Sequence, residues 1–121
     1  MANSFCHIEL HTSDVDKAKG FYGGLLDWKL EDMPMGDTSY TMVSSGDETI
    51  GGMMTKPCDD APTAWMPYIL VEDVDGSTAK AVELGGSVVK EKTEIPGRGS
   101  FSIVADPTGA VVGLWQAKGD D

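Results

Sequence analysis

The chain has 121 residues, of which 40% are hydrophobic, and it carries 20 acidic against 9 basic side chains for a formal net charge of −11. This length and composition suit one folded domain with its own core and argue against a disordered segment. Such an acidic protein repels phosphate backbones and anionic lipids, and no apolar run approaches the roughly 18 residues of a spanning helix, so we expect no nucleic-acid or membrane partner.

The first residues lack the charged region and apolar core of a signal peptide, so the expected location is cytoplasmic. Residues 5–11 then alternate as a strand, with Ile8 and Leu10 on one face and His7 and Glu9 on the other. The two faces differ in polarity, which indicates that only the first is turned toward a core.

A helix is expected next, beginning at Ser13, whose spacing to Asp16 resembles a capping box, and running to about Leu26. Three short strands follow, divided by turns rich in Gly, Pro and Asp, at residues 28–30, 39–44 and 48–54.

Residues 55–63 read as a polar linker, after which the same order returns. The second half predicts, in order, a strand, a helix closed by Gly85-Gly86, and three strands, at residues 65–71, 73–84, 87–91, 99–105 and 110–116. A β-turn at Asp106-Pro107-Thr108-Gly109 joins the last two.

The two halves are therefore a repeat, marked by Asp14-Val15-Asp16 and, 59 positions later, Asp73-Val74-Asp75. The prediction is an α+β fold of two pseudo-symmetric βαβββ modules, at about residues 4–54 and 64–117. They would form a single domain over residues 1–121 with a concave mixed sheet. A ligand would bind in the cavity between the modules, because each helix covers one face of its strands and leaves the other open.

With this order, the chain resembles the glyoxalase / bleomycin resistance protein / extradiol dioxygenase superfamily, also called vicinal oxygen chelate proteins. The motifs that carry the resemblance lie in both halves: His7 to Asp14, Ala18 to Tyr22, Leu25 to Trp28, Tyr68 to Asp75, Glu83 to Gly86 and Asp106 to Gly109. The segments Ile50 to Met54 and Asp106 to Gln116 resemble a glyoxalase-like subgroup related to a mycobacterial 27-kDa antigen.

The resemblance implies one divalent metal ion, held by the first and last strand of each half. His7 stands at the first of these positions, but its repeat mate is Met66, which is a poor ligand for a hard ion. The last-strand positions fall on Gly113 and on Gly51 or Gly52. Three of the four ligand positions are thus lost. We expect no cofactor, and if a metal ion is bound, the ligands would be His7 and Glu9.

Two other roles are open for His7 and Glu9. His7 could be a hydrogen-bonded side chain filling a sheet face, or the two could anchor a ligand. If His7 is the partner that a buried Glu9 needs, the pair would raise the proton affinity of the imidazole and could act as a general base. They are the only catalytic candidates.

Other candidate ligand contacts are mostly aromatic or Met side chains, which suit a planar or apolar small molecule. The full expected ligand-binding set is His7, Glu9, Met42, Met53, Trp65, Tyr68, Arg98, Phe101 and Trp115. Ordinary core packing is the alternative for each apolar member, and a solvated loop arginine for Arg98. Cys6 is expected to be buried and Cys58 exposed, without a disulfide.

Three functions remain open at this point. The first is a metal-independent small-molecule-binding protein of the glyoxalase/bleomycin-resistance type. The second is a metal-dependent or acid/base lyase, isomerase or dioxygenase that uses His7 and Glu9. The third is a non-catalytic partner domain, and by analogy with the superfamily we expect a homodimer.

Overall fold

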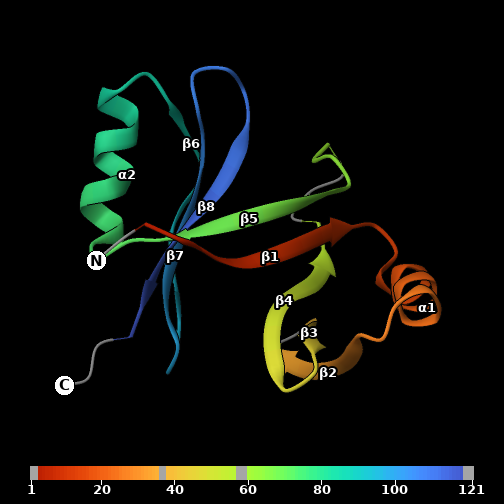
Figure 1. Ribbon diagram of the computed structural model, residues 1–121. Helices are drawn as coiled ribbons and strands as arrows, with labels where there is room; N and C mark the ends of the chain where they lie inside the picture. Colours follow the sequence, from red (N-terminus) through yellow and green to blue (C-terminus); the bar gives the residue numbers. More distant parts are fainter. Residues whose placement is uncertain (1–2, 36–37, 57–59, 119–121) are drawn as a thin grey trace. The chain divides into compact units, whose positions relative to one another are not determined.

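The computed structural model describes residues 3–35, 38–56 and 60–118 and contains two helices and eight strands (Figure 1). The order is βαβββ twice, as predicted. The elements of the first half are β1 Phe5–Thr12, α1 Val15–Leu25, β2 Lys29–Met35, β3 Thr38–Ser45 and β4 Glu48–Thr55. Those of the second are β5 Ala64–Leu70, α2 Val74–Glu83, β6 Ser87–Ile95, β7 Gly99–Ala105 and β8 Val111–Ala117. The α+β class is confirmed.

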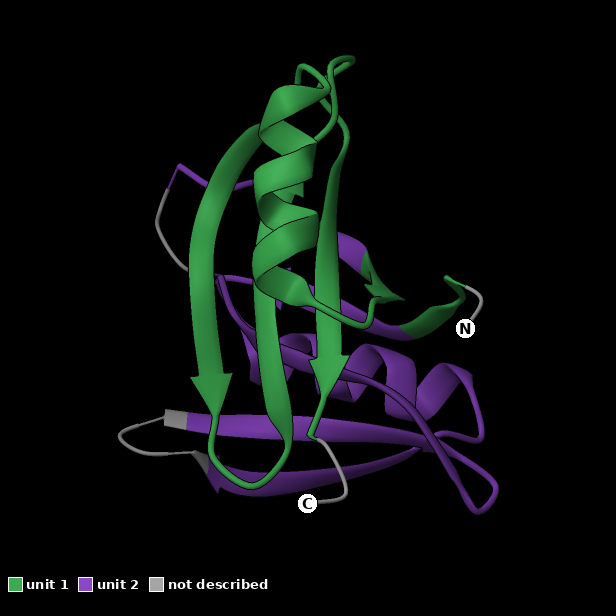
Figure 2. Ribbon diagram, turned by 90° about the vertical axis from the view of Figure 1, so that its left-hand side faces the viewer, with its two compact units in different colours: residues 1–6, 67–121 green, residues 7–66 purple. Residues whose placement is uncertain are grey.

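The chain forms two compact units, coloured separately in Figure 2. One contains residues 7–66, and we call it the polar unit for the site described below. The other contains residues 67–121 together with residues 1–6, and we call it the aromatic unit.

Both units use the same strand pairing. In the polar unit the strand order is β2-β3-β4-β1, and in the aromatic unit it is β6-β7-β8-β5. The first and last strand of each half pair in parallel, with Glu9 beside Gly52 in one unit and Tyr68 beside Gly113 in the other. The remaining pairs are antiparallel. Glu9 and Tyr68 therefore hold equivalent places, and so do the two glycines.

The Asp-Val-Asp repeat marks the start of each helix. Asp14 caps α1 by accepting a hydrogen bond from the backbone N–H of Lys17 at 3.0 Å, and Asp73 caps α2 by accepting one from Gly76 at 3.2 Å. The predicted cap at Ser13 was wrong by one residue. At the other end of α2, Gly85 takes φ +99°, a conformation that favours glycine, as the predicted cap required.

Each helix covers one face of its own strands. In the polar unit Leu10, Val43 and Met53 form the buried core, and Val15, Ala18 and Tyr22 of α1 pack on it. In the aromatic unit, α2 contributes Val74 and Ala81 to the core. The buried cluster there consists of Val71, Val74, Val104 and Leu114, and Ile69, Ala81 and Val112 pack against it. Leu25, the last residue of α1, and Leu84, the C-cap of α2, are exposed.

Cys6 is exposed rather than buried, and its thiol lies 3.6 Å from the carbonyl oxygen of Tyr68. Cys58 lies outside the described residues. Neither of the two helices in the described part of the chain is long and apolar enough to cross a membrane.

Candidate functional site

The polar face of β1 carries the candidate site. Because side chains alternate along a strand, His7, Glu9 and His11 lie on the face opposite Leu10 and helix α1. Tyr40 joins them from β3, and a Cβ atom placed on Gly52 would overlap its ring and hydroxyl. The phenol of Tyr40 therefore occupies the space above Gly52 and reaches Glu9.

These four side chains form one hydrogen-bonded chain. The Tyr40 hydroxyl donates to Glu9 Oε2 at 2.6 Å and lies 2.8 Å from His7 Nε2. His11 Nε2 lies 2.7 Å from the other carboxylate oxygen of Glu9. An ionised carboxylate only accepts, and the phenol has one proton, so Nε2 must carry the proton in both histidines. The order of donation is His7 to Tyr40, Tyr40 to Glu9 and His11 to Glu9.

Glu9 is the centre of this chain. The residue is only 6% exposed, and an ionised carboxylate is costly at such a place unless donors surround it. Tyr40 and His11 supply one donor to each oxygen. The geometry differs from the expected pair, because the Tyr40 hydroxyl stands between His7 and Glu9.

The protonation of His7 also differs from the expectation. Burial disfavours the imidazolium and lowers the pKa of His7 below its usual value of 6.5, while the charge of Glu9 acts in the opposite direction and is the smaller effect. The predicted rise in proton affinity was wrong because the burial of His7 outweighs the charge of Glu9. His7 is therefore neutral at neutral pH.

This shift predicts a pH dependence of stability. Below about pH 6.5 the unfolded chain takes up a proton that folded His7 resists, so the free energy of unfolding should fall as pH drops through the folded pKa. Urea unfolding of the wild type and His7→Gln between about pH 7 and 5 measures it. The variant lacks the imidazole, so the wild type should lose more stability than the variant over this range. A constant difference between the two curves would contradict the shift.

The aromatic unit has a different set of side chains at the equivalent positions. Tyr68 stands where Glu9 stands in the other unit, and its ring fills the space above Gly113. Phe101 contacts the Tyr68 ring edge-on, with 5.9 Å between ring centroids. Trp115 is two residues from Gly113 on β8 and so lies on this same face, opposite Leu114 and α2. This face is aromatic where that of the polar unit is hydrogen-bonding.

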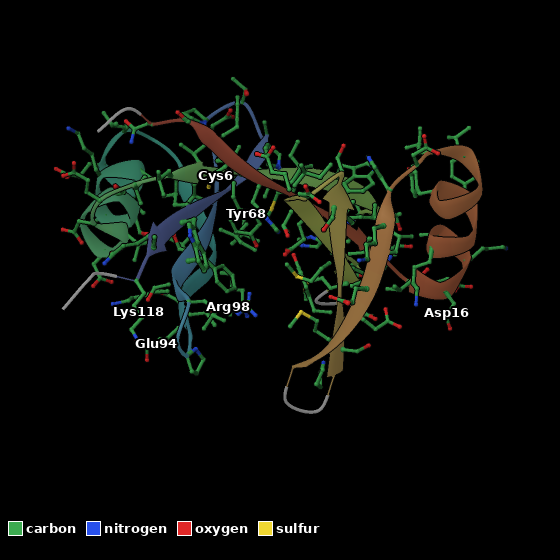
Figure 3. The ribbon with its side chains drawn as sticks, turned by 60° about the horizontal axis from the view of Figure 1, so that its bottom comes forward. Cys6, Asp16, Tyr68, Glu94, Arg98 and Lys118 are labelled. Carbon is green, nitrogen blue, oxygen red and sulfur yellow. The ribbon has the colours of Figure 1, made fainter. Side chains whose placement is uncertain are left out.

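The other predicted ligand contacts fall in different places. Met42 is paired with Gly52 and lies on the face of the His7–Glu9 cluster. Met53 and Trp65 belong instead to the core that packs on α1, where the Trp65 indole N–H donates to the Tyr22 hydroxyl at 3.1 Å. Arg98 is exposed in the turn between β6 and β7, at the end of the aromatic unit where Glu94 and Lys118 also lie (Figure 3).

Two surface hollows are found elsewhere. One, of about 450 Å³, lies in the polar unit beside the start of α1, where Lys19 pairs with Asp32 at 2.8 Å and Thr41 donates to the same carboxylate. These bonds, that from Lys19 first, lower the pKa of Asp32. The other, of about 410 Å³, lies in the aromatic unit beside the β6–β7 turn. Neither is lined by the His7–Glu9 cluster.

The residues present do not fit the metal site that the fold implies. The register places Gly52 and Gly113 at the last-strand ligand positions, and both lack a side chain. Met66 occupies the third position, and the Tyr40 hydroxyl bridges His7 and Glu9. Among the described residues, no group of three or more His, Cys, Asp and Glu side chains is placed to share an ion.

Two members of the cluster, Tyr40 and His11, were not predicted as site residues. His11 shares the face of Glu9 two residues away, a signal that the alternation of β1 already contains. Tyr40 could be found only from the strand register, which pairs Gly52 with Met42, two residues after Tyr40 and on the same face of β3. The glycine at position 52 was the one indirect signal of a ring above it.

Comparison with known proteins agrees with this architecture. Residues 4–114, which span both units, match the model of the glyoxalase/bleomycin resistance protein/dioxygenase superfamily. The chain belongs to this superfamily. A relative from Mycobacterium tuberculosis named "Putative glyoxylase CFP32" is 37% identical over 92% of this chain and 44% of its own length. The anthracycline biosynthesis protein DnrV of Streptomyces peucetius is 25% identical over 90% of this chain and 45% of its own.

The chain thus spans less than half the length of these superfamily relatives. Among solved structures, hypothetical protein BH1468 from Bacillus halodurans has a TM-score of 0.70 at 15% identity and covers 100% of this chain and 99% of its own. Methylmalonyl-CoA epimerase from Mycobacterium tuberculosis has a TM-score of 0.68 at 14% identity, covering 95% of this chain and 88% of its own. These likenesses show the fold.

Proposed function

We propose that this superfamily member binds a small molecule without a metal ion, on the sheet face that α1 leaves uncovered in the polar unit. The observation that carries the proposal is the chain of hydrogen bonds through His7, Tyr40, Glu9 and His11. A buried polar network costs stability unless every member is satisfied, and its presence on the sheet face opposite α1 suits recognition of a polar group. The neutral imidazole of His7 would contact the ligand.

The aromatic unit supports the expectation that the ligand has a planar or apolar group. Tyr68, Phe101 and Trp115 share the equivalent face there, and stacked or edge-on aromatic surfaces suit a planar or apolar group. Met53 and Trp65 are left out of the proposed set because they build the core under α1.

A thermal-shift screen of planar small molecules, followed by titration of the molecules that stabilise the protein, tests this function. His7→Ala should weaken binding of such a molecule at least tenfold, because it removes the proposed contact. Lys17→Ala, on the exposed side of α1, is the matched control and should leave the affinity unchanged. Equal affinity in wild type and His7→Ala would remove His7 from the site.

A second candidate function is acid/base catalysis. The lowered pKa of His7 keeps its imidazole neutral. A neutral imidazole that is hydrogen-bonded to a phenol, which in turn is hydrogen-bonded to a carboxylate, can act as a general base. Turnover of a screened compound, lost in His7→Ala and retained after chelation, would favour this candidate. Turnover that depends on added divalent ion would favour a metal enzyme instead.

The remaining predictions concern assembly and location. We propose a single domain made of both units, a homodimer and a cytoplasmic protein. Sedimentation velocity of the untagged chain measures the oligomeric state, and a monomer at micromolar concentration would contradict the dimer.

A further inference from the structure

The place of Tyr40 and Gly52 in the cluster suggests what happened to the metal site. The hydroxyl of Tyr40 lies 2.8 Å from His7 Nε2 and 2.6 Å from Glu9 Oε2, the two side chains expected to hold a metal ion if one were bound. An ion bound to both would lie about 2.0–2.2 Å from each, so it would need nearly the same position as the hydroxyl oxygen. The phenol and an ion therefore exclude each other.

The ring of Tyr40 also excludes a third ligand. A side chain at position 52 would begin where the hydroxyl end of the ring lies, so no residue larger than glycine fits there while Tyr40 keeps its place. Gly52 is paired with Glu9 across the parallel strands, and a carboxylate at 52 would otherwise be well placed beside it. One residue thus blocks both the ion and its missing ligand.

The aromatic unit repeats this arrangement by a different route. The space above Gly113 is filled by the ring of Tyr68, which comes from β5, whereas Tyr40 comes from β3. The residue of β7 that corresponds to Tyr40 is Phe101, and it packs against Tyr68. A tyrosine above a glycine therefore occurs at the last-strand position of both units.

We propose that the Tyr40 phenol replaces the divalent ion of the superfamily: its hydroxyl accepts a hydrogen bond from His7, donates one to Glu9 and closes the position to metal. Tyr40 is thus a positioning residue for His7. This inference rests on the proposed metal independence and goes further, because it names the side chain responsible. It also implies that the metal position can be reopened by changing two residues.

The reopening can be measured as Zn²⁺ binding. Tyr40→Ala removes the hydroxyl and ring, and Gly52→Asp then adds a carboxylate beside Glu9, giving three protein ligands as in catalytic zinc sites. We expect Y40A/G52D to bind one equivalent of Zn²⁺ at least 100-fold more tightly than wild type in calorimetric titration. Adding His7→Ala should abolish this gain, which separates the site from adventitious binding to the acidic surface.

Folding is checked by circular dichroism and cooperative melting. If Y40A/G52D does not fold, Tyr40→Ala alone decides, with an expected gain of at least tenfold that His7→Ala removes. A folded Y40A/G52D, or failing it a folded Y40A, that binds Zn²⁺ no more tightly than wild type would overturn the role of Tyr40.

Wild-type protein that binds one equivalent through His7 would overturn both this inference and the proposed metal independence. Absence of any ligand in the thermal-shift screen would count only against the proposed function.

Discussion

Replacing Glu9 with alanine is expected to lower the free energy of unfolding by about 3 kcal/mol, because Tyr40 and His11 then lose their acceptor inside the structure. Unfolding in urea, followed by circular dichroism, measures the loss. The substitution should also abolish ligand binding, since His7 is held through Tyr40.

The controls for Glu9 distinguish the network from the loss of a charge. Glu48→Ala removes an exposed carboxylate at the start of β4 and should change stability by less than about 0.5 kcal/mol. Glu9→Gln keeps one acceptor oxygen and should fall between the two. If Glu9→Ala were as stable as Glu48→Ala, the hydrogen-bonded chain would not exist in solution as described.

The second large effect is expected in the core. Met53 is completely buried between Leu10 and Val43 beneath α1, so Met53→Ala should cost about 2–5 kcal/mol through lost burial and the cavity left behind. Met53→Leu conserves the volume and should cost less than about 1.5 kcal/mol. Thermal melts of both variants give the comparison.

This pair of variants also decides the role of Met53. If Met53 contacted the ligand instead of the core, the alanine variant would melt near the wild-type temperature and lose affinity. The structure predicts the reverse, with a large drop in melting temperature and unchanged affinity in the protein that remains folded.

Much of the fold follows from periodicity in the sequence. The two Asp-Val-Asp segments, each after an apolar alternating run, correctly predicted α1 and α2 and hence βαβββ twice. The edge strands of the two units were predicted too short. β2 continues through Glu31 and Pro34 to Met35, and β6 continues through the charged run after Lys90 to Ile95. Edge strands tolerate proline and charge, so hydrophobic alternation does not show their ends.

Only the site residues that lie together on one strand could be predicted from the sequence. His7 and Glu9 follow from the alternation of β1 alone. Tyr40 depends on how β3 pairs with β4, and the Gly51-Gly52-Met53-Met54 run has no alternation that reveals which side Met53 takes. The lowered pKa of His7 likewise depends on how far the fold buries its ring, which the alternation of β1 does not show.

In the proposed arrangement, a hydrogen-bonded chain of side chains takes the place of a metal ion. Nitrogen-15 NMR of the imidazole rings tests it most directly, because the untagged chain has only two histidines. At neutral pH we predict that the His7 ring is neutral with its proton on Nε2, and that the signals of neither ring change on chelation or on addition of one equivalent of Zn²⁺. A stoichiometric change in the His7 signals with Zn²⁺, reversed by chelator, would contradict the account.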